Sequence, residues 1–568
     1  MQTNYDVVVV GAGVAGAIFA WKLSQLRPDN SILLIDAGDN PLDEGMRHHF
    51  LETFALAIDR GVLSPYRRLD SNKFAPSPES GVDTKHYVQA GPDKYKSNYV
   101  RMVGGSTWSW RGNCPRWVPN DFRLKSAYGV GEDWPFTYND IEPYFCDAED
   151  ELGVSADHDE QKHLPGAGTR SRPYPMPKIA QAFGDLIIKK RVDGLDVDGK
   201  RITVVATPQA RNSQKYQDRS ECLGNANCIP ICPSGAKYDA SVHLKRLAKI
   251  KGVAMQWHSV VSRLEVGSGG AIKTVYFRDW RQPGAPEQSV AGKIVVLATH
   301  AIETPRLWLI SKLDNSRDLV GRFLTDHLAH EVTGYMDQPI YPFRGPQNTS
   351  SVFDFRDGEF RKRCSAFNIT VGNDGWGRKL SPFAALDKMA WDSDKKRIRN
   401  FGKALQKELT VGDKAITRMI RISYSTEQLP EPDNRVTLAD EKDPLGLQRP
   451  KVSYKVSDYS IRGLEYGHSV AHRILKRAVS DDEHDADRRL DHTPEANPTF
   501  NGAGHPMGTC RMGISSSNSV VDPFGQSHAH PNLYVVGSSV FVTGSSVNPT
   551  LLLAALALRT AESIAKHS

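Results

Sequence analysis

Cysteine, long apolar runs and an excess of one charge are all scarce in this sequence of 568 residues. Seven cysteines are too few for a disulfide framework, and three of them are clustered, which indicates metal or redox chemistry. No stretch is apolar and long enough to predict a transmembrane helix. The net charge of +6 is diffuse, and no basic run contains interleaved aromatic residues, which disfavours nucleic-acid binding.

The N-terminus and the composition set further expectations. The first residues, MQTNYD, contain no charged leader before the first expected strand, so we expect no signal peptide on this chain. The composition, 39% hydrophobic and 24% charged, is typical of a soluble globular protein. The chain is too long for one simple core, and we therefore expect two closely connected domains.

The chain opens with a dinucleotide-binding pattern. The apolar run Tyr5–Val10 predicts a buried strand, and Ala17–Leu26 predicts a helix. Between them lies a fingerprint whose glycines are Gly11, Gly13 and Gly16. Such glycines let the backbone approach a pyrophosphate at a helix N-terminus, and Asp36, after a second strand, is placed to bond a ribose hydroxyl. The pattern does not distinguish FAD from NAD.

A glycine pair followed by hydroxyls and tryptophans occupies residues 104–110. Gly104, Gly105 and Thr107 suit a loop whose backbone packs against a flat ring. A glycine turn with buried tryptophans explains the same residues equally well.

Cys222, Cys228 and Cys232 lie on a loop rich in glycine, asparagine and proline. Closely spaced thiolates of this kind can share one inorganic centre, and a Cys-x3-Cys-Pro ending also occurs in bacterial iron–sulfur sequences. Without an obvious fourth cysteine, a three-iron cluster is favoured over a four-iron one. Structural zinc, with His243 as the nearest spare histidine, and three unrelated thiols are the alternatives.

His505 lies in a Gly/Pro-rich turn near the C-terminus, and Asn548 lies in an Asn-Pro turn. Between them Leu533–Val536 predicts a buried strand, and Leu551–Leu558 predicts a core helix with Pro549 in its first turn. The two polar side chains suit a base and its partner facing one ligand. On local sequence alone, a turn histidine and a helix cap would explain them as well.

The fold class expected is α/β with an α+β second part. A helix at Val242–Lys251, strand-like segments Met255–Val266 and Lys273–Arg278, and a buried strand at Ile294–Ala298 predict a second pass through the nucleotide-binding sheet. Further strands are expected in an antiparallel sheet of a substrate-binding domain over residues 331–494; they are Arg418–Tyr424, Arg435–Leu438 and Lys451–Val456. Residues 1–330 would form the dinucleotide domain, with an irregular segment at 40–95 and the cysteine loop at about 215–240. Residues 495–568 would return to it.

Together these residues resemble the glucose–methanol–choline (GMC) family of FAD oxidoreductases. The segments that carry the resemblance are Gly11–Gly16 with Asp36, Gly104–Gly105, Ala298–Pro305, Phe323–His327, His505–Gly513, Val520–Pro523 and Asn548–Pro549. The cysteines narrow it to the catalytic subunits of bacterial FAD/[3Fe–4S] sugar dehydrogenases, which include glucose, fructose and glucoside 3-dehydrogenases. The HPMGTCRMG form after His505 departs from the glucose and fructose enzymes, which favours C3 of a glucoside as the oxidised carbon.

The resemblance implies FAD, and a [3Fe–4S] cluster on Cys222, Cys228 and Cys232. The FAD would contact the residues predicted above together with Val261, Ala298, Gly537, Ser538, Asn548 and Pro549. His505 would be the catalytic base, and Asn548 would orient the substrate oxygen. From their residue types alone, Asp326 and His327 are interpreted either as a second pair facing the ligand or, preferentially, as residues that cap or support the site. The family also implies a small chaperone-like subunit with a twin-arginine signal, a periplasmic location, and a c-type cytochrome acceptor that brings membrane association. An oxidase using dioxygen and a non-redox flavoprotein of the same fold are the alternatives.

Overall fold

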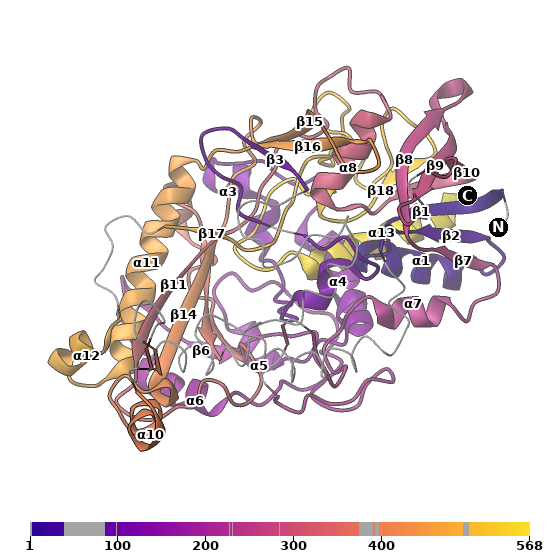
Figure 1. Ribbon diagram of the computed structural model, residues 1–568. Coiled ribbons are helices and arrows are strands. Elements are labelled where there is room, and N and C mark those ends of the chain that lie inside the picture. The colour runs from indigo at the N-terminus through magenta and orange to yellow at the C-terminus, as the bar shows by residue number, and fades with distance from the viewer. Residues whose placement is uncertain are drawn as a thin grey trace.

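The computed structural model describes residues 3–38, 86–97, 99–225, 228–229, 231–282, 284–373, 390–391, 397–398, 400–491 and 499–567. Most of the irregular segment expected at 40–95 lies outside these residues. Two large sheets stand at opposite sides of the molecule, joined by helices and long loops (Figure 1).

The first sheet has seven strands: β1 (Asn4–Val10), β2 (Ile32–Ile35), β7 (Val253–Gln256), β8 (Ser259–Val266), β9 (Ile272–Asp279), β10 (Gln288–Leu297) and β18 (Leu533–Val535). Strands β7, β2, β1, β10 and β18 are parallel, and β9 and β8 extend β10 as an antiparallel hairpin. The expected second pass is therefore confirmed, although the segment Met255–Val266 is divided between two strands. A turn at His258, with φ of 58°, separates them.

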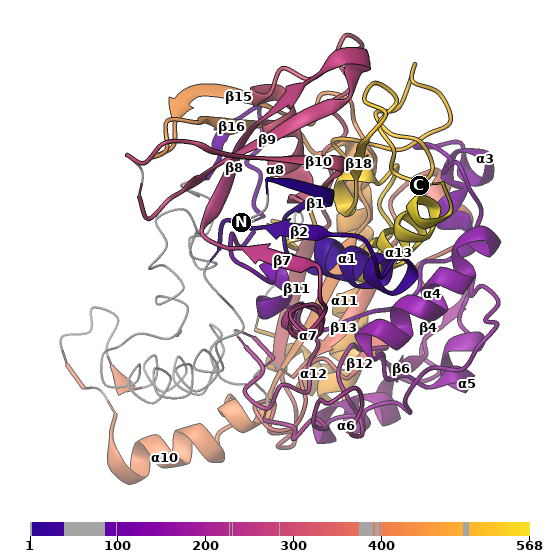
Figure 2. The ribbon, with the colours of Figure 1, turned by 90° about the vertical axis from the view of Figure 1, so that its right-hand side faces the viewer.

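Helix α1 (Val14–Leu26) packs against β1 and β2 of this sheet, and α7 (Ser241–Leu247) and α13 (Thr550–His567) pack against α1, with α4 (Tyr138–Leu152) beyond α13. Helix α13 packs against both α1 and α4, so the two ends of the chain meet in one domain (Figure 2). The predicted core helix at Leu551–Leu558 lies within α13, and its leucines and alanines are buried against α1.

The second sheet is antiparallel and contains β6 (Val204–Ala206), β11 (Leu328–Tyr335), β12 (Ser350–Val352), β13 (Phe367–Gly372), β14 (Met419–Thr426) and β17 (Asn501–Gly502). Their order is β17-β11-β14-β13-β12-β6. Helix α11 (Asp458–Val479) packs along the outer face, where Ile420 and Ile422 of β14 are fully buried (Figure 1). The antiparallel sheet is confirmed. Because β6 and β17 come from outside residues 331–494, the domain boundaries remain a prediction.

Two of the strands expected in that sheet belong elsewhere. β15 (Arg435–Lys442) pairs with β16 (Gln448–Ser453), and β16 pairs with β3 (Val88–Ala90), in a third sheet that packs against α8 (His300–Ile310). Buried Arg306 of α8 donates to the Gln448 carbonyl and to Asp443, at 2.7 Å each. The predicted placement of these two strands was wrong. The alternation of apolar and polar residues identifies a strand but does not identify the strand with which it pairs.

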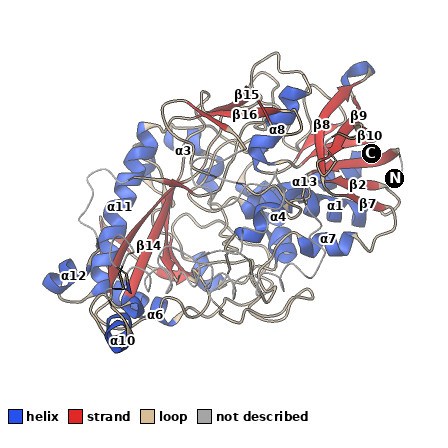
Figure 3. Ribbon diagram, viewed as in Figure 1, coloured by secondary structure: helices blue, strands red, loops and turns tan. Residues whose placement is uncertain are grey.

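Long loops connect the remaining elements (Figure 3), which are β4 (Asp196–Val197), β5 (Lys200–Arg201), α3 (Leu124–Tyr128), α5 (His158–Lys162), α6 (Phe183–Val192), α10 (Gly402–Thr410) and α12 (Glu483–Arg489). In the part of the chain that the structure describes, no helix is long and apolar enough to cross a bilayer.

Candidate functional site

A cavity of about 1000 Å³ is lined by residues from both large sheets. At one end it begins at the carboxyl edge of β1, next to Gly11 and Gly13. At the other end it reaches His505 and the inner face of the antiparallel sheet, including Ser423. The cavity thus joins the predicted dinucleotide turn to the predicted catalytic residues.

The turn after β1 needs its glycines because the backbone is crowded on one side and open on the other. A side chain at Gly11, whose φ is 101°, would lie 2.5 Å from the Ala298 carbonyl oxygen, and one at Gly16 would lie 2.0 Å from that of Gly11. Gly13 instead has open space where a Cβ would be. This leaves room for a group at the N-terminus of α1, where helix dipoles favour phosphate.

Asp36 stabilises this turn through backbone amides. Its carboxylate accepts hydrogen bonds from Ala12 N at 2.8 Å and from Gly38 N at 2.7 Å. Burial raises the pKa of the carboxyl group, and the two amides oppose that effect. Asp36 also lines the cavity, so the predicted ribose contact is available to it.

Most residues predicted to contact the cofactor line this cavity: Gly11, Gly13, Asp36, Gly105, Thr107, Val261, Ala298, Gly537, Ser538, Asn548 and Pro549. Gly16 and Gly104 do not line it and act through backbone packing instead. Gly104 has φ of 91°, and a Cβ there would lie 2.4 Å from Nε1 of Trp108. That indole donates to the Val103 carbonyl at 2.9 Å.

His505 and Asn548 are brought together although 43 residues separate them. His505 Nε2 lies 3.1 Å from Asn548 Nδ2, and His505 Nδ1 lies 2.9 Å from Nδ1 of His327. Because an amide nitrogen can only donate, Nε2 of His505 accepts and carries no proton. The proton of a neutral ring is then on Nδ1, where it is donated to His327. The base therefore presents its unprotonated nitrogen beside Asn548.

Asp326 holds the backbone around both histidines. One carboxylate oxygen accepts from His327 N at 2.7 Å and from His505 N at 2.9 Å, and the other accepts from the Ser97 hydroxyl. Burial raises the pKa of Asp326 to about 6. The FLTDH segment belongs to the motifs that carry the family resemblance. No feature of its local sequence predicts the contact between His327 and His505.

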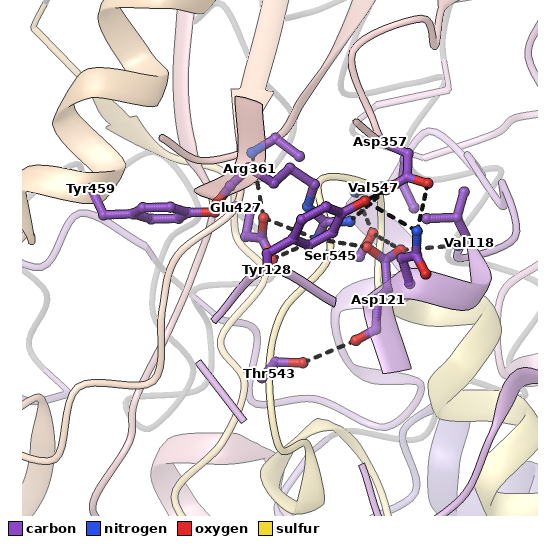
Figure 4. Close-up of polar contacts among 12 residues, drawn as sticks. Val118, Asp121, Tyr128, Asp357, Arg361, Glu427, Tyr459, Thr543, Ser545 and Val547 are labelled. Atoms are coloured by element: carbon purple, nitrogen blue, oxygen red, sulfur yellow. Dashed lines mark hydrogen bonds and ion pairs between the residues drawn. The ribbon is translucent and has the colours of Figure 1, made fainter. Parts of the chain in front are cut away.

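Asn548 is carried by a loop anchored to a buried charged cluster (Figure 4). The Ser545 hydroxyl donates to Asp121 at 2.8 Å, and Val547 N donates to Ser545 at 3.4 Å. The other Asp121 oxygen lies 2.9 Å from the guanidinium of Arg361, a fully buried cation that also contacts Glu427. No sequence pattern predicts this cluster, because its residues are far apart in the chain and lie in different elements.

Comparisons with known proteins identify the family of this chain. Residues 430–557 match the family model described as GMC oxidoreductase. The chain is 32% identical to the fructose dehydrogenase large subunit of Gluconobacter japonicus, covering 98% of this chain and 97% of that protein. The chain belongs to the GMC oxidoreductase family. It is accordingly an FAD-dependent oxidoreductase that acts on CH–OH donors.

Other GMC-type relatives span the whole chain at lower identity. The C-glycoside 3-oxidase of Microbacterium trichothecenolyticum is 24% identical, with 99% of this chain and 96% of that protein covered. Among solved structures, Aspergillus oryzae formate oxidase superposes with a TM-score of 0.63 at 15% identity, covering 100% of this chain and 99% of that one. The latter likeness shows the fold alone.

The cysteine loop adjoins this cavity. Ile229, next to Cys228, lines the cavity, and Ile231 packs with Met102 and Trp108 of the glycine-pair segment. Cys228 and Cys232 are buried, and Cys222 is partly exposed.

The three thiols influence one another electrostatically. Burial raises the pKa of Cys222, and the charges of Cys228 and Cys232 raise it further, whereas Arg211 lowers it. Among the residues described, no group of three or more His, Cys, Asp or Glu side chains is arranged to hold a metal ion. The cluster on these cysteines therefore stays a prediction.

The pH dependence of the base follows from its surroundings. Burial, and to a smaller extent His327, lowers the pKa of His505 well below its ordinary value. A base must be unprotonated, so activity is lost only as pH falls through that lowered pKa. We expect the anaerobic rate of flavin reduction to stay level from pH 8 down to about 6.5, the unperturbed value. A rate that already halves at pH 7 in stopped-flow measurements would contradict this assignment.

The anchor of the Asn548 loop gives a second prediction. Ser545→Ala removes both the bond to Asp121 and the acceptor for Val547 N, so Asn548 loses its fixed position. We expect flavin reduction to slow about tenfold, as for loss of one positioning hydrogen bond of about 1.4 kcal/mol. Ser262→Ala, which removes another buried serine bonded to a carboxylate, Glu287, is the matched control. Equal effects of the two variants on rate would contradict the positioning role.

Proposed function

We propose that this chain is the catalytic subunit of an FAD dehydrogenase that oxidises a hydroxyl group of a sugar or glycoside. The observation that carries the proposal is the 3.1 Å contact between His505 Nε2 and Asn548 Nδ2 on the wall of the cavity that begins at the dinucleotide turn. The named activities of the fructose dehydrogenase and C-glycoside 3-oxidase relatives support a sugar-like substrate.

In this proposal His505 removes the proton from the substrate hydroxyl. Its unprotonated Nε2 accepts that proton, and the Asn548 amide donates to the oxygen as negative charge develops there. The positive charge that then forms on the His505 imidazole is stabilised by the hydrogen bond from Nδ1 to His327. When bound, FAD supplies the acceptor for the hydride that leaves the same carbon.

We further propose that Cys222, Cys228 and Cys232 hold a [3Fe–4S] cluster. Buried Arg211 donates to the Cys228 sulfur at 2.8 Å, so a cationic side chain lies beside one of the three proposed iron ligands. Buried Lys237 donates to the Trp108, Trp110 and Cys228 carbonyls at 2.7–2.8 Å, so it joins the cysteine loop to the cavity wall. When bound, such a cluster supplies a one-electron acceptor for onward transfer.

The remaining elements of the proposal come from the resemblance to the FAD/[3Fe–4S] sugar dehydrogenases. A small chaperone-like subunit with a twin-arginine signal would export the folded chain to the periplasm, and a c-type cytochrome would accept its electrons and associate it with the membrane. The fructose dehydrogenase relative is a large subunit, which supports the presence of additional subunits. Within the substrate class, C3 of a glucoside is the favoured position, in line with the C-glycoside 3-oxidase relative.

A panel of sugars and glycosides with an artificial electron acceptor tests the proposal. Turnover of at least one glucoside or free sugar, without peroxide, is the expected result. Peroxide formed in proportion to substrate would favour the runner-up, an oxidase that delivers electrons directly to dioxygen. Absence of both turnover and flavin bleaching with every sugar and glycoside of the panel would contradict the proposed sugar dehydrogenase function.

A further inference from the structure

The inner face of the antiparallel sheet presents polar residues to the cavity in register across three strands. Ser423 of β14 is paired with Glu331 of β11 on one side and with Thr370 of β13 on the other. Two residues along β14, Ser425 is flanked in the same way by Ala329 and Asn368, and these residues all line the cavity. The sheet thus offers two cross-strand rows separated by about 7 Å, the length of two residues of strand.

The two rows differ in what they contact. Asn368 Nδ2 donates to the carbonyl of Ser546, two residues before Asn548, so its row adjoins the catalytic pair. The Glu331 row lies one step further along the strands. Its central hydroxyl, Ser423 Oγ, has no hydrogen-bond partner among the described residues. A buried hydroxyl without a partner is costly, and a ligand hydroxyl in the cavity would satisfy it.

Among the described residues, an ion pair between β14 and β11 contributes to the charge of this outer row. Arg421 Nη1 donates to Glu331 Oε2 at 2.5 Å. The Arg421 side chain is 5% exposed, whereas that of Glu331 is 45% exposed. The carboxylate is therefore the end of the pair that is open to a ligand, while the guanidinium is covered and already neutralised.

We propose that Glu331, Arg421 and Ser423 form a subsite that selects neutral polyhydroxylated substrates against sugar acids. Hydroxyl groups of the substrate donate to the exposed Glu331 carboxylate and pair with Ser423, while the reacting hydroxyl lies at His505 and Asn548. A carboxylate on the substrate would meet the like charge of Glu331 and find Arg421 already paired. Lys96, another cation of the cavity lining, donates to the Phe500 carbonyl at 2.7 Å. This inference rests on the proposed sugar dehydrogenase function.

The test compares neutral sugars with the matching aldonic and uronic acids, using the FAD-loaded enzyme and an artificial acceptor. Wild-type kcat/KM is expected to be at least about tenfold higher for the neutral members, since hydrogen bonds to charged groups are the stronger kind. Glu331→Gln keeps a hydrogen-bond acceptor for Arg421 but removes the negative charge of the carboxylate. The positive charge of Arg421 then has no counter-charge at position 331. We expect this variant to lose about tenfold in kcat/KM for neutral sugars, mainly through KM, and to gain activity on the acids.

Ser423→Ala provides an independent measurement and removes only the unpartnered hydroxyl. It is expected to raise KM for neutral sugars several-fold without changing the thermal midpoint. The inference is overturned if the wild type prefers sugar acids, or if Glu331→Gln leaves the ratio of neutral to acidic substrates unchanged. Failure of every sugar and sugar acid to reduce the flavin would instead remove the proposed function, so the two failures are distinguishable.

Discussion

Replacing His505 by alanine is expected to slow the anaerobic bleaching of the flavin by substrate by about 100- to 10,000-fold, the usual contribution of a positioned general base. The geometry makes this residue hard to substitute. Its Nε2 faces Asn548, its Nδ1 is occupied by His327, and its backbone amide is held by Asp326. Stopped-flow absorbance of the flavin measures the effect directly.

Two controls separate catalysis from folding in that experiment. The flavin content and thermal midpoint of His505→Ala should match the wild type, because the backbone contact to Asp326 is retained. His528→Ala alters another histidine in the same C-terminal region, one bonded to Ser519 and not part of the cavity lining, and should bleach at the wild-type rate. Fast bleaching in His505→Ala would exclude His505 as the base.

Replacing Cys228 by serine should separate the two halves of the reaction. The cavity residues that bind flavin and substrate are unchanged, so anaerobic bleaching should remain within about twofold of the wild type. Reduction of cytochrome c should fall to background, because the proposed cluster loses one of its three ligands. The measurement follows the flavin and the haem separately in one anaerobic mixing experiment.

Cys364→Ser is the matched control for this loss. Cys364 is a partly exposed thiol whose nearest polar contact is the Phe360 carbonyl, well outside the cysteine loop in sequence. Cytochrome reduction should be unaffected in this variant. Survival of cytochrome reduction in Cys228→Ser would contradict the proposed route for the electrons.

The sequence predicted the first sheet because its signals are local. The apolar run of β1, the glycines that follow and Asp36 all lie within a single βαβ unit, where each residue specifies its neighbours. The same holds for α13, because the apolar segment Leu551–Leu558 predicts a helix that the structure confirms. β15 and β16 were predicted as strands, but β3, the partner of β16, lies about 360 residues earlier, and the alternation of apolar and polar residues cannot identify such a partner.

The site residues that could be predicted from the sequence are those that the family resemblance identifies. That resemblance paired His505 with Asn548, and the structure brings the two side chains together. It did not show that His327 would meet His505 ring to ring, 178 residues apart in sequence. The Asp121–Arg361–Glu427 cluster was missed altogether, because three separate charged residues show no pattern until the fold buries them together.

Analysis of iron and acid-labile sulfide in the purified FAD-loaded protein tests the account most directly. The account predicts about three irons and four sulfides per flavin, with an EPR signal from the oxidised cluster that disappears when substrate is added without oxygen. A full flavin spectrum with neither iron nor sulfide would contradict it, and the chain would then be an oxidase of the same family.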